Sequence, residues 1–163
     1  MPHIPESANE FDWHKYFAIQ ANNRAWDLAS QRSRSDEEAV ELLDQAHTSA
    51  RHWNAVGTEL NKMRATYLIA EAHALEGSKQ LAVKLATLAL EYFQPEETDD
   101  WEIAFIYAIY AHALSGSLES GEFASAYHRA KLAVESISDP EDKAIVDQTF
   151  CQIPRPKENA RGV

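Results

Sequence analysis

The chain has 163 residues, enough for one compact domain, and a hydrophobic content of 45%, which is ordinary for a globular protein. Asp and Glu number 26 against 15 Lys and Arg, and the resulting net charge of −11 argues against binding to nucleic acid or to an anionic membrane surface. The single cysteine, Cys151, excludes a disulfide within the chain and fits a reducing, cytoplasmic location. We find no signal-peptide pattern at the N-terminus and no apolar run long enough to cross a membrane.

Apolar residues recur every three or four positions along most of the chain, which is the spacing of one helix face. No segment alternates apolar and polar residues between hairpin turns, so we predict an all-α fold of about seven helices. Three helices are predicted over about residues 8–31, 59–76 and 121–137. The other four lie between Ser35 and Gly57, Ser78 and Pro95, Thr98 and Gly116, and Ser138 and Pro154.

Residues of the capping type mark six of the seven predicted helix starts. Three Ser-x-x-Glu patterns have the spacing of a capping box, in which each side chain bonds a free amide of the first turn. Single serine or threonine residues precede three further helices. The boxes are Ser7 with Glu10, Ser35 with Glu38, and Ser138 with Glu141, and the single caps are Thr58, Ser78 and Thr98. Residues 1–153 are therefore predicted to form one helical domain, and the polar residues 154–163 a disordered tail.

An internal repeat organises the middle of the chain. Residues 72–78 and 111–117 share the pattern Ala-His-Ala-Leu-x-Gly-Ser at an offset of 39. The helices that follow also match, residues 82–91 with residues 126–135, at an offset of 44 because of a longer turn over 117–121. A period of about 40 residues made of two helices is typical of an α-solenoid.

These features resemble the tetratricopeptide repeat (TPR) family, whose repeats are helix pairs in which the second helix carries small residues seven apart and a proline follows. The tryptophan and Leu-Gly positions of the family's first helix are not kept. The resemblance covers about residues 8–152, and it implies three helix hairpins with a C-terminal capping helix in an α-solenoid. The small-residue pairs are Ala39 with Ala46, Ala82 with Ala89, and Ala126 with Ala133, with Pro95 after the second pair and Pro140 further displaced.

Three short segments, residues 22–28, 56–61 and 139–142, also resemble a group of uncharacterised bacterial TPR-like proteins. That group has no assigned activity, so this likeness implies no functional residues. The wider family resemblance says little about function. The repeat, an uncharged fifth helix and the absence of a catalytic pattern favour a non-catalytic scaffold or adaptor that binds a protein or peptide in its concave groove.

The predicted fifth helix is the main clue to such a groove. Residues 103–114 carry no formal charge and are apolar on all sides, which is typical of a helix buried all round. An apolar peptide could cover its concave face, as could the C-terminal segment, a second copy of the chain in a homodimer, or a tightly curled array. The net charge favours an apolar or basic partner. By the repeat register, the groove-facing residues are Arg64, Tyr67, Glu71, Ile103, Ile106 and Tyr110.

A second hypothesis is a small-molecule-binding protein or enzyme with a pocket between the first helices of the repeats. His73 and His112 are equivalent in the repeat, and we expect them to stack and to hydrogen-bond within one layer, with metal binding and proton chemistry as alternatives. The residues of this alternative pocket are Asn22, Asn23, Trp26, His73 and His112. The asparagines could instead be buried amides that hold the first helix to the third.

Known catalytic and metal-binding patterns are missing from the sequence. It contains no Glu-x-x-His pair, no phosphate loop and no nucleophile elbow, so we predict no catalytic residue, metal or cofactor. Cys151 lies at the end of the last predicted helix, and we expect it to be buried as a small apolar residue.

Overall fold

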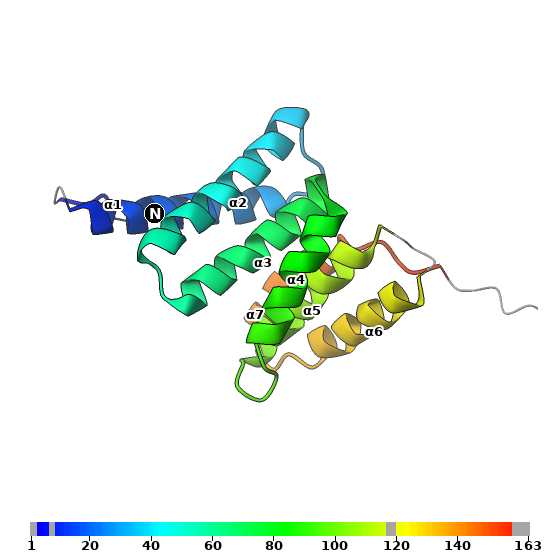
Figure 1. The fold of residues 1–163 in the computed structure, drawn as a ribbon. Helices are drawn as coiled ribbons and strands as arrows, with labels where there is room; N and C mark the ends of the chain where they lie inside the picture. The colour runs from blue at the N-terminus through cyan, green and yellow to red at the C-terminus, as the bar shows by residue number, and fades with distance from the viewer. Residues whose placement is uncertain (1–2, 7–8, 117–119, 158–163) are drawn as a thin grey trace, which may run out of the picture.

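The computed structural model describes residues 3–6, 9–116 and 120–157. Its regular structure in this part of the chain is entirely α-helical (Figure 1), as the sequence predicts. None of the helices described there has the length and apolar character needed to cross a membrane. The seven helices are α1 (Glu10–Ala29), α2 (Asp36–Val56), α3 (Glu59–Glu76), α4 (Lys79–Tyr92), α5 (Asp100–Leu114), α6 (Gly121–Glu135) and α7 (Pro140–Phe150).

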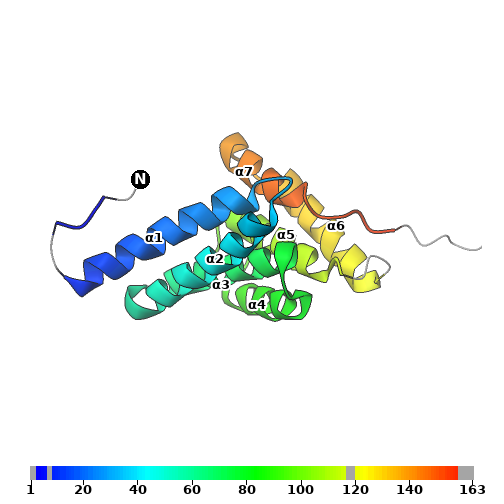
Figure 2. The same ribbon diagram turned by 90° about the horizontal axis from the view of Figure 1, so that it is seen from above.

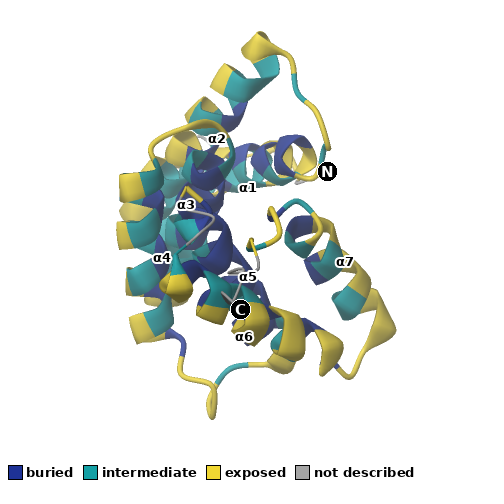
Figure 3. Ribbon diagram, turned by 90° about the vertical axis from the view of Figure 1, so that its right-hand side faces the viewer, coloured by how far each residue is buried: buried dark blue, intermediate teal, exposed yellow. Residues whose placement is uncertain are grey.

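Consecutive helices form the most extensive contacts, in the pairs α1 with α2, α5 with α6, and α3 with α4. Helix α3 also packs against α1, α2 and α5, and α7 packs against α5 and α6. Seen from above, α7 lies beside α5 and α6, and the first turns of α1 project away from the rest with the end of α2 (Figure 2). Helix α5 therefore occupies the centre of the molecule, and ten of its 15 residues are buried (Figure 3).

Three of the predicted caps are confirmed. Ser35 and Glu38 form the capping box of α2, with Ser35 Oγ accepting from the Glu38 amide at 3.2 Å and Glu38 Oε2 accepting from the Ser35 amide at 2.9 Å. Thr58 caps α3 in the same way with Asn61, and Ser78 caps α4. These helix starts are decided locally, because each cap lies within three residues of the amide it satisfies.

Three other predicted caps need correction. Ser7 lies outside the described residues, and the residue that caps α1 is Asn9, whose Oδ1 accepts from the Phe11 amide at 3.0 Å. Asp99 replaces Thr98 before α5 and makes no side-chain cap bond. Asp139 replaces Ser138 before α7.

A tertiary contact explains why Asp139, and not Ser138, caps α7. The Ser138 amide donates to Asp100 Oδ2 at 2.9 Å, which joins the start of α7 to the start of α5. Asp139 Oδ1 then accepts from the amides of Glu141 and Asp142 at 2.7 and 3.2 Å, with Pro140 at the first helical position. The Ser138 bond also lowers the pKa of the Asp100 carboxyl.

At the C-terminus, α7 ends at Phe150, and residues 154–157 form no helix. Residues 158–163 of the predicted tail, and residues 117–119 of the predicted longer turn, lie outside the described part of the chain. Ile153 is buried against Ala108, Ala111 and Phe123, so the segment after α7 packs on α5 and α6. The C-terminal segment thus contributes to the core.

Phe123 and Leu132 give a matched test of this packing, because both lie on α6. Phe123 is 0% exposed and Leu132 is 50% exposed. We expect Phe123→Ala to lower the free energy of unfolding by about 3–5 kcal/mol through lost burial and a cavity. We expect Leu132→Ala to change it by no more than about 0.5 kcal/mol. Urea denaturation measures both, and equal effects would contradict the packing.

Candidate functional site

Four of the six expected groove residues lie in the core. Tyr67, Glu71, Ile103 and Ile106 are buried, because α5 packs against α3 on one side and α7 on another. The open groove expected along α3 and α5 is therefore closed by the chain itself. Of the alternatives considered from sequence, cover by the C-terminal segment is the arrangement observed, since α7 and Ile153 contact α5, α6 or both.

The polar members of the set bond other helices. Arg64 donates to both oxygens of Glu102 at 2.8 and 2.9 Å, and the Tyr67 hydroxyl donates to Glu102 Oε1 at 3.2 Å. The bond to Glu102 raises the pKa of Arg64, and burial followed by the charge of Glu102 raises the pKa of Tyr67. The Tyr110 hydroxyl donates to Glu122 at 3.0 Å, which links α5 to α6. These residues hold helices together.

In the described part of the chain, the asparagines of the alternative pocket make no hydrogen bond to α3. Asn22 Nδ2 donates to Asn23 Oδ1 at 3.3 Å on the surface of α1. Trp26 instead makes the link, because its ring packs on Phe105 and Tyr67 with centroids 5.1 and 6.3 Å apart. The aromatic ring, and not an amide, joins α1 to α3 and α5.

The two repeat-equivalent histidines have different partners, so the expected stack between them is not formed. His73 Nε2 lies 3.0 Å from His47 Nε2 of α2, and His73 Nδ1 accepts from the Ser78 amide at 3.1 Å. Since Nδ1 is an acceptor, Nε2 carries the proton and donates to His47. Burial, and then the neighbouring His47, lower the pKa of His73.

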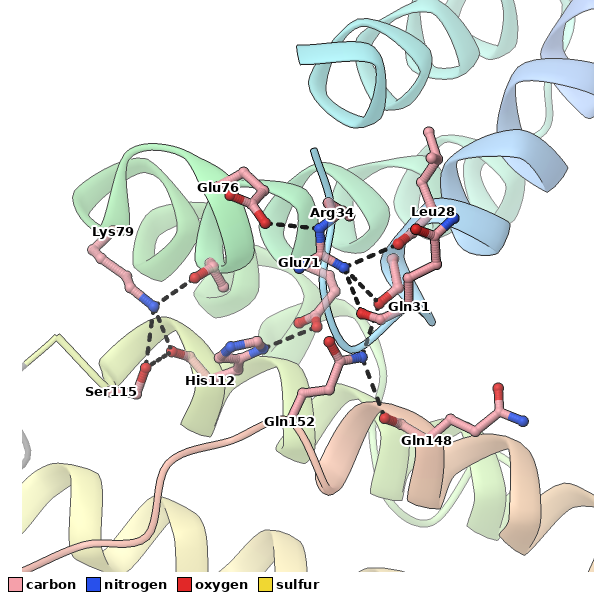
Figure 4. Close-up of polar contacts among 12 residues, drawn as sticks. Leu28, Gln31, Arg34, Glu71, Glu76, Lys79, His112, Ser115, Gln148 and Gln152 are labelled. Atoms are coloured by element: carbon pink, nitrogen blue, oxygen red, sulfur yellow. Dashed lines mark hydrogen bonds and ion pairs between the residues drawn. The ribbon is translucent and has the colours of Figure 1, made fainter. Parts of the chain in front are cut away.

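The partner of His112 is a carboxylate, whereas the partner of His73 is another histidine. The Nδ1 atom of His112 lies 2.9 Å from Glu71 Oε1 of α3 (Figure 4). Glu71 is 0% exposed and His112 is 4% exposed, so an ionisable pair is enclosed between α3 and α5. Glu71 Oε2 has no hydrogen-bond partner among the described residues. Buried polar atoms without a partner are rare in folded proteins.

Next to this pair the structure has a pocket of about 760 Å³. Its wall combines the loop between α1 and α2, the last turns of α3 and α5, the start of α4, and α7 with the residues after it. Cys151, which we expected to be buried, is exposed and lines this pocket. The other lining residues include Ser30, Arg32, Arg34, Leu75, Lys79, His112, Ser115, Ala144, Asp147, Gln148 and Gln152.

The pocket gathers three helix C-termini. Arg34 Nη1 donates to the carbonyls of Leu28 and Gln31 at 3.0 and 2.7 Å, at the end of α1, and Gln152 Nε2 donates to the Ala29 carbonyl at 2.8 Å. Lys79 donates to carbonyls in the last turns of α3 and α5.

Lys79 Nζ donates to the Ala74 carbonyl, to Ser115 Oγ at 3.1 Å and to the His112 carbonyl at 3.5 Å (Figure 4). Burial lowers the pKa of Lys79, and the charge of Glu71 opposes that shift. Arg34, Lys79 and Gln152 are not among the site residues predicted from the sequence. A usable signal exists for the first two, because a basic residue shortly after a helix end is a common partner of free carbonyls.

No protein-family model, curated protein or solved structure matches this chain. Across the described residues, no three His, Cys, Asp or Glu side chains gather in a way that could hold a metal ion. The two His–His contacts, His47 with His73 and His14 with His52, contain two ring nitrogens each. Because no known protein matches, the geometry of the site is the basis for assigning a function.

His73 gives the stability a pH dependence. An unfolded histidine has a pKa of about 6.5, whereas burial and His47 lower the pKa of His73 in the folded state. As the pH falls below about 6.5, His73 binds a proton in the unfolded chain before it does so in the folded protein. The free energy of unfolding therefore decreases from about pH 6.5 down to the lowered pKa of the folded state. We expect His73→Asn to reduce the loss of unfolding free energy between about pH 7.5 and pH 5.

His128 is the control for this measurement, because it is exposed on α6. We expect urea denaturation at several pH values to show that the free energy of unfolding of His128→Asn depends on pH as that of the wild type does. An identical pH dependence for His73→Asn and the wild type would show that the His47–His73 contact does not govern it.

Proposed function

We propose that the protein is a non-catalytic binding module of the TPR-like α-solenoid type, and that its ligand is a small molecule held in the pocket between α3, α5 and α7. Three observations support the architecture: the sequence repeat, the pairing of consecutive helices, and the position of α7 after the third pair. The packing of α7 on α5 and α6 supports the proposed capping role of α7.

The observation that carries the binding proposal is the pocket beside the buried Glu71–His112 pair. A volume of about 760 Å³ lies in the range of small-ligand sites. Its wall brings together segments from Ser30 to Pro154, so several separate polar groups converge on one cavity. A peptide groove along Ile103 and Ile106 has less support, because both side chains are buried.

A pocket-filling substitution tests this proposal. Ala144 is exposed on α7 and lines the pocket, whereas the adjacent Ile145 is 58% exposed and does not line it. We expect Ala144→Trp to occupy the cavity and to abolish ligand binding with little effect on stability. Ile145→Trp should leave binding unchanged.

The measurement is ligand-detected NMR with a panel of small polar compounds of varied charge, using the wild type and both variants. At least one compound should bind the wild type and Ile145→Trp but not Ala144→Trp. A panel in which every binder still binds Ala144→Trp would refute the pocket as the binding site.

A second candidate function, recognition of a partner protein, rests on the aromatic residues of the first turns of α1. Phe11 and Phe17 are 51% and 44% exposed, and the Phe17 ring packs with Trp13 and Tyr16 at centroid distances of 5.7 and 5.4 Å. This part of α1, together with the end of α2, projects beyond the other helices (Figure 2). Exposed aromatic residues of this kind are enriched in protein interfaces.

We expect Phe17→Ser to abolish specific capture of a partner protein, and Val40→Ser, a substitution at a residue 60% exposed on α2, to leave capture unchanged. Affinity capture with mass spectrometry compares the two variants with the wild type, and light scattering reports whether the partner is a second copy. Capture that survives Phe17→Ser would refute this surface.

A further inference from the structure

The charged side chains on the wall of the pocket are predominantly basic. Arg32, Arg34 and Lys79 line the cavity, and Asp147 is the one acidic lining residue in the described part of the chain. The chain as a whole, in contrast, has a net charge of −11. The basic wall is therefore a local feature of an acidic protein, and it favours an anionic ligand.

Arg34 is the enclosed member of this set, because its side chain is 6% exposed. Its Nε donates to Glu76 at 2.7 Å, and its Nη1 donates to carbonyls at the end of α1 (Figure 4). These bonds fix the plane of the guanidinium, whereas Nη2 makes no hydrogen bond to the described residues. An arginine is always protonated in proteins, so Arg34 supplies a positioned cationic donor that the fold leaves unused.

Arg32 is the second available donor, and it is exposed and without a partner among the described residues. It lies two residues before Arg34 in the loop between α1 and α2, so this loop brings both side chains to one wall. Lys79 adds charge but no free donor, because its Nζ already donates to two carbonyls and to Ser115. The free guanidinium of Arg32 can pair with a carboxylate through two parallel hydrogen bonds.

The rest of the wall suits an anion with an uncharged body. Glu71 and Glu76 bond His112 and Arg34 and do not line the cavity, so their carboxylates are not part of its surface. The C-terminal ends of α1, α3 and α5 border it with partial negative charge, which favours a carboxylate over a more highly charged phosphate. Polar and apolar side chains complete the wall, among them Gln148, Gln152, Ala74, Leu75, Ala144 and Pro154.

We infer that the ligand of this pocket is a small organic acid, whose carboxylate binds Arg32 and Arg34 Nη2 and whose uncharged part contacts the apolar wall. The chemical class of the ligand is assigned on the basis of the proposed function. A hydrogen bond between charged partners is stronger than a neutral one, and the enclosure of Arg34 strengthens it further. Because the acidic chain repels anions in general, saturable binding of an acid identifies a local site.

The test uses three probes of equal chain length and different charge: hexanoate, 1-hexanol and hexylamine. Each is titrated at neutral pH and constant ionic strength into the full-length protein labelled with ¹⁵N. We expect hexanoate to bind saturably and to shift the side-chain signals of Arg32 and Arg34 together with amide signals of the pocket wall. We expect 1-hexanol and hexylamine to bind more weakly by about tenfold or more, because neither can accept a charge-assisted bond from the arginines.

Arg32→Gln removes the charge at a residue that has no partner to lose in the described part of the chain. We expect it to weaken hexanoate binding by about tenfold or more. Arg51→Gln is the matched control, because Arg51 is exposed on α2 and does not line this pocket. It should leave hexanoate binding unchanged, and dispersed amide signals establish that both variants are folded.

Four results would overturn the assignment of an acid. The first is binding of hexylamine or 1-hexanol as tight as that of hexanoate, and the second is hexanoate binding unchanged by Arg32→Gln. The third is a set of shifts confined to basic residues elsewhere, such as Lys131 and Arg155, which line a separate surface pocket. The fourth is displacement of hexanoate by inorganic phosphate at an equal or lower concentration, which would indicate a phosphate site.

Ala144→Trp distinguishes failure of this assignment from failure of the proposed function. A probe of any charge that binds the wild type but not Ala144→Trp keeps the pocket as a binding site, even where the acid assignment fails. Hexanoate binding that is lost in both Ala144→Trp and Arg32→Gln supports the pocket and the acid together. Hexanoate binding that survives Ala144→Trp would overturn both.

Discussion

The free carbonyls at the ends of α1, α3 and α5 impose the constraint on which the arrangement of this protein depends. The last four carbonyls of a helix have no partner within it, and here three such ends meet on one side of the molecule. Arg34, Lys79 and Gln152 supply the donors from a loop, a neighbouring helix and the C-terminal segment. Satisfying the helix ends therefore also fixes the path of the chain around them.

The apolar character of α5 is the second determinant, because it requires cover on every side. Helices α3, α4, α6 and α7 all contact it, and its residues from Ile103 to Ile106 are buried as a result. The cover by α7 turns what the repeat register predicts as an open groove into an enclosed interface with a pocket at one end. An uncharged apolar helix of this kind predicts burial, but its sequence does not indicate which element covers it.

The buried polar groups next to the pocket differ from those elsewhere in the core, because one of them has no hydrogen-bond partner. The buried carboxylate of Glu102 is satisfied by two bonds from Arg64 and one from Tyr67. The pair of Glu71 and His112 leaves an acceptor without a donor, and an unmet buried acceptor has a cost of about 1–3 kcal/mol. A pocket lies beside this unmet acceptor, and for that reason the ligand proposal is centred there.

The all-α class and most helix bounds follow from sequence, because helical periodicity and caps such as Ser35 and Thr58 act within one or two turns. The local Ser-x-x-Glu pattern predicts Ser138 as the cap of α7, and this is wrong. The cap is Asp139, because the Ser138 amide donates to Asp100, 38 residues earlier in the chain. His73 and His112 are equivalent in sequence, yet the first contacts α2 and the second α3, because their neighbours are not equivalent. The candidate site depends on contacts as distant as Gln152 with Ala29, 123 residues apart, and no local pattern encodes which donor reaches which helix end.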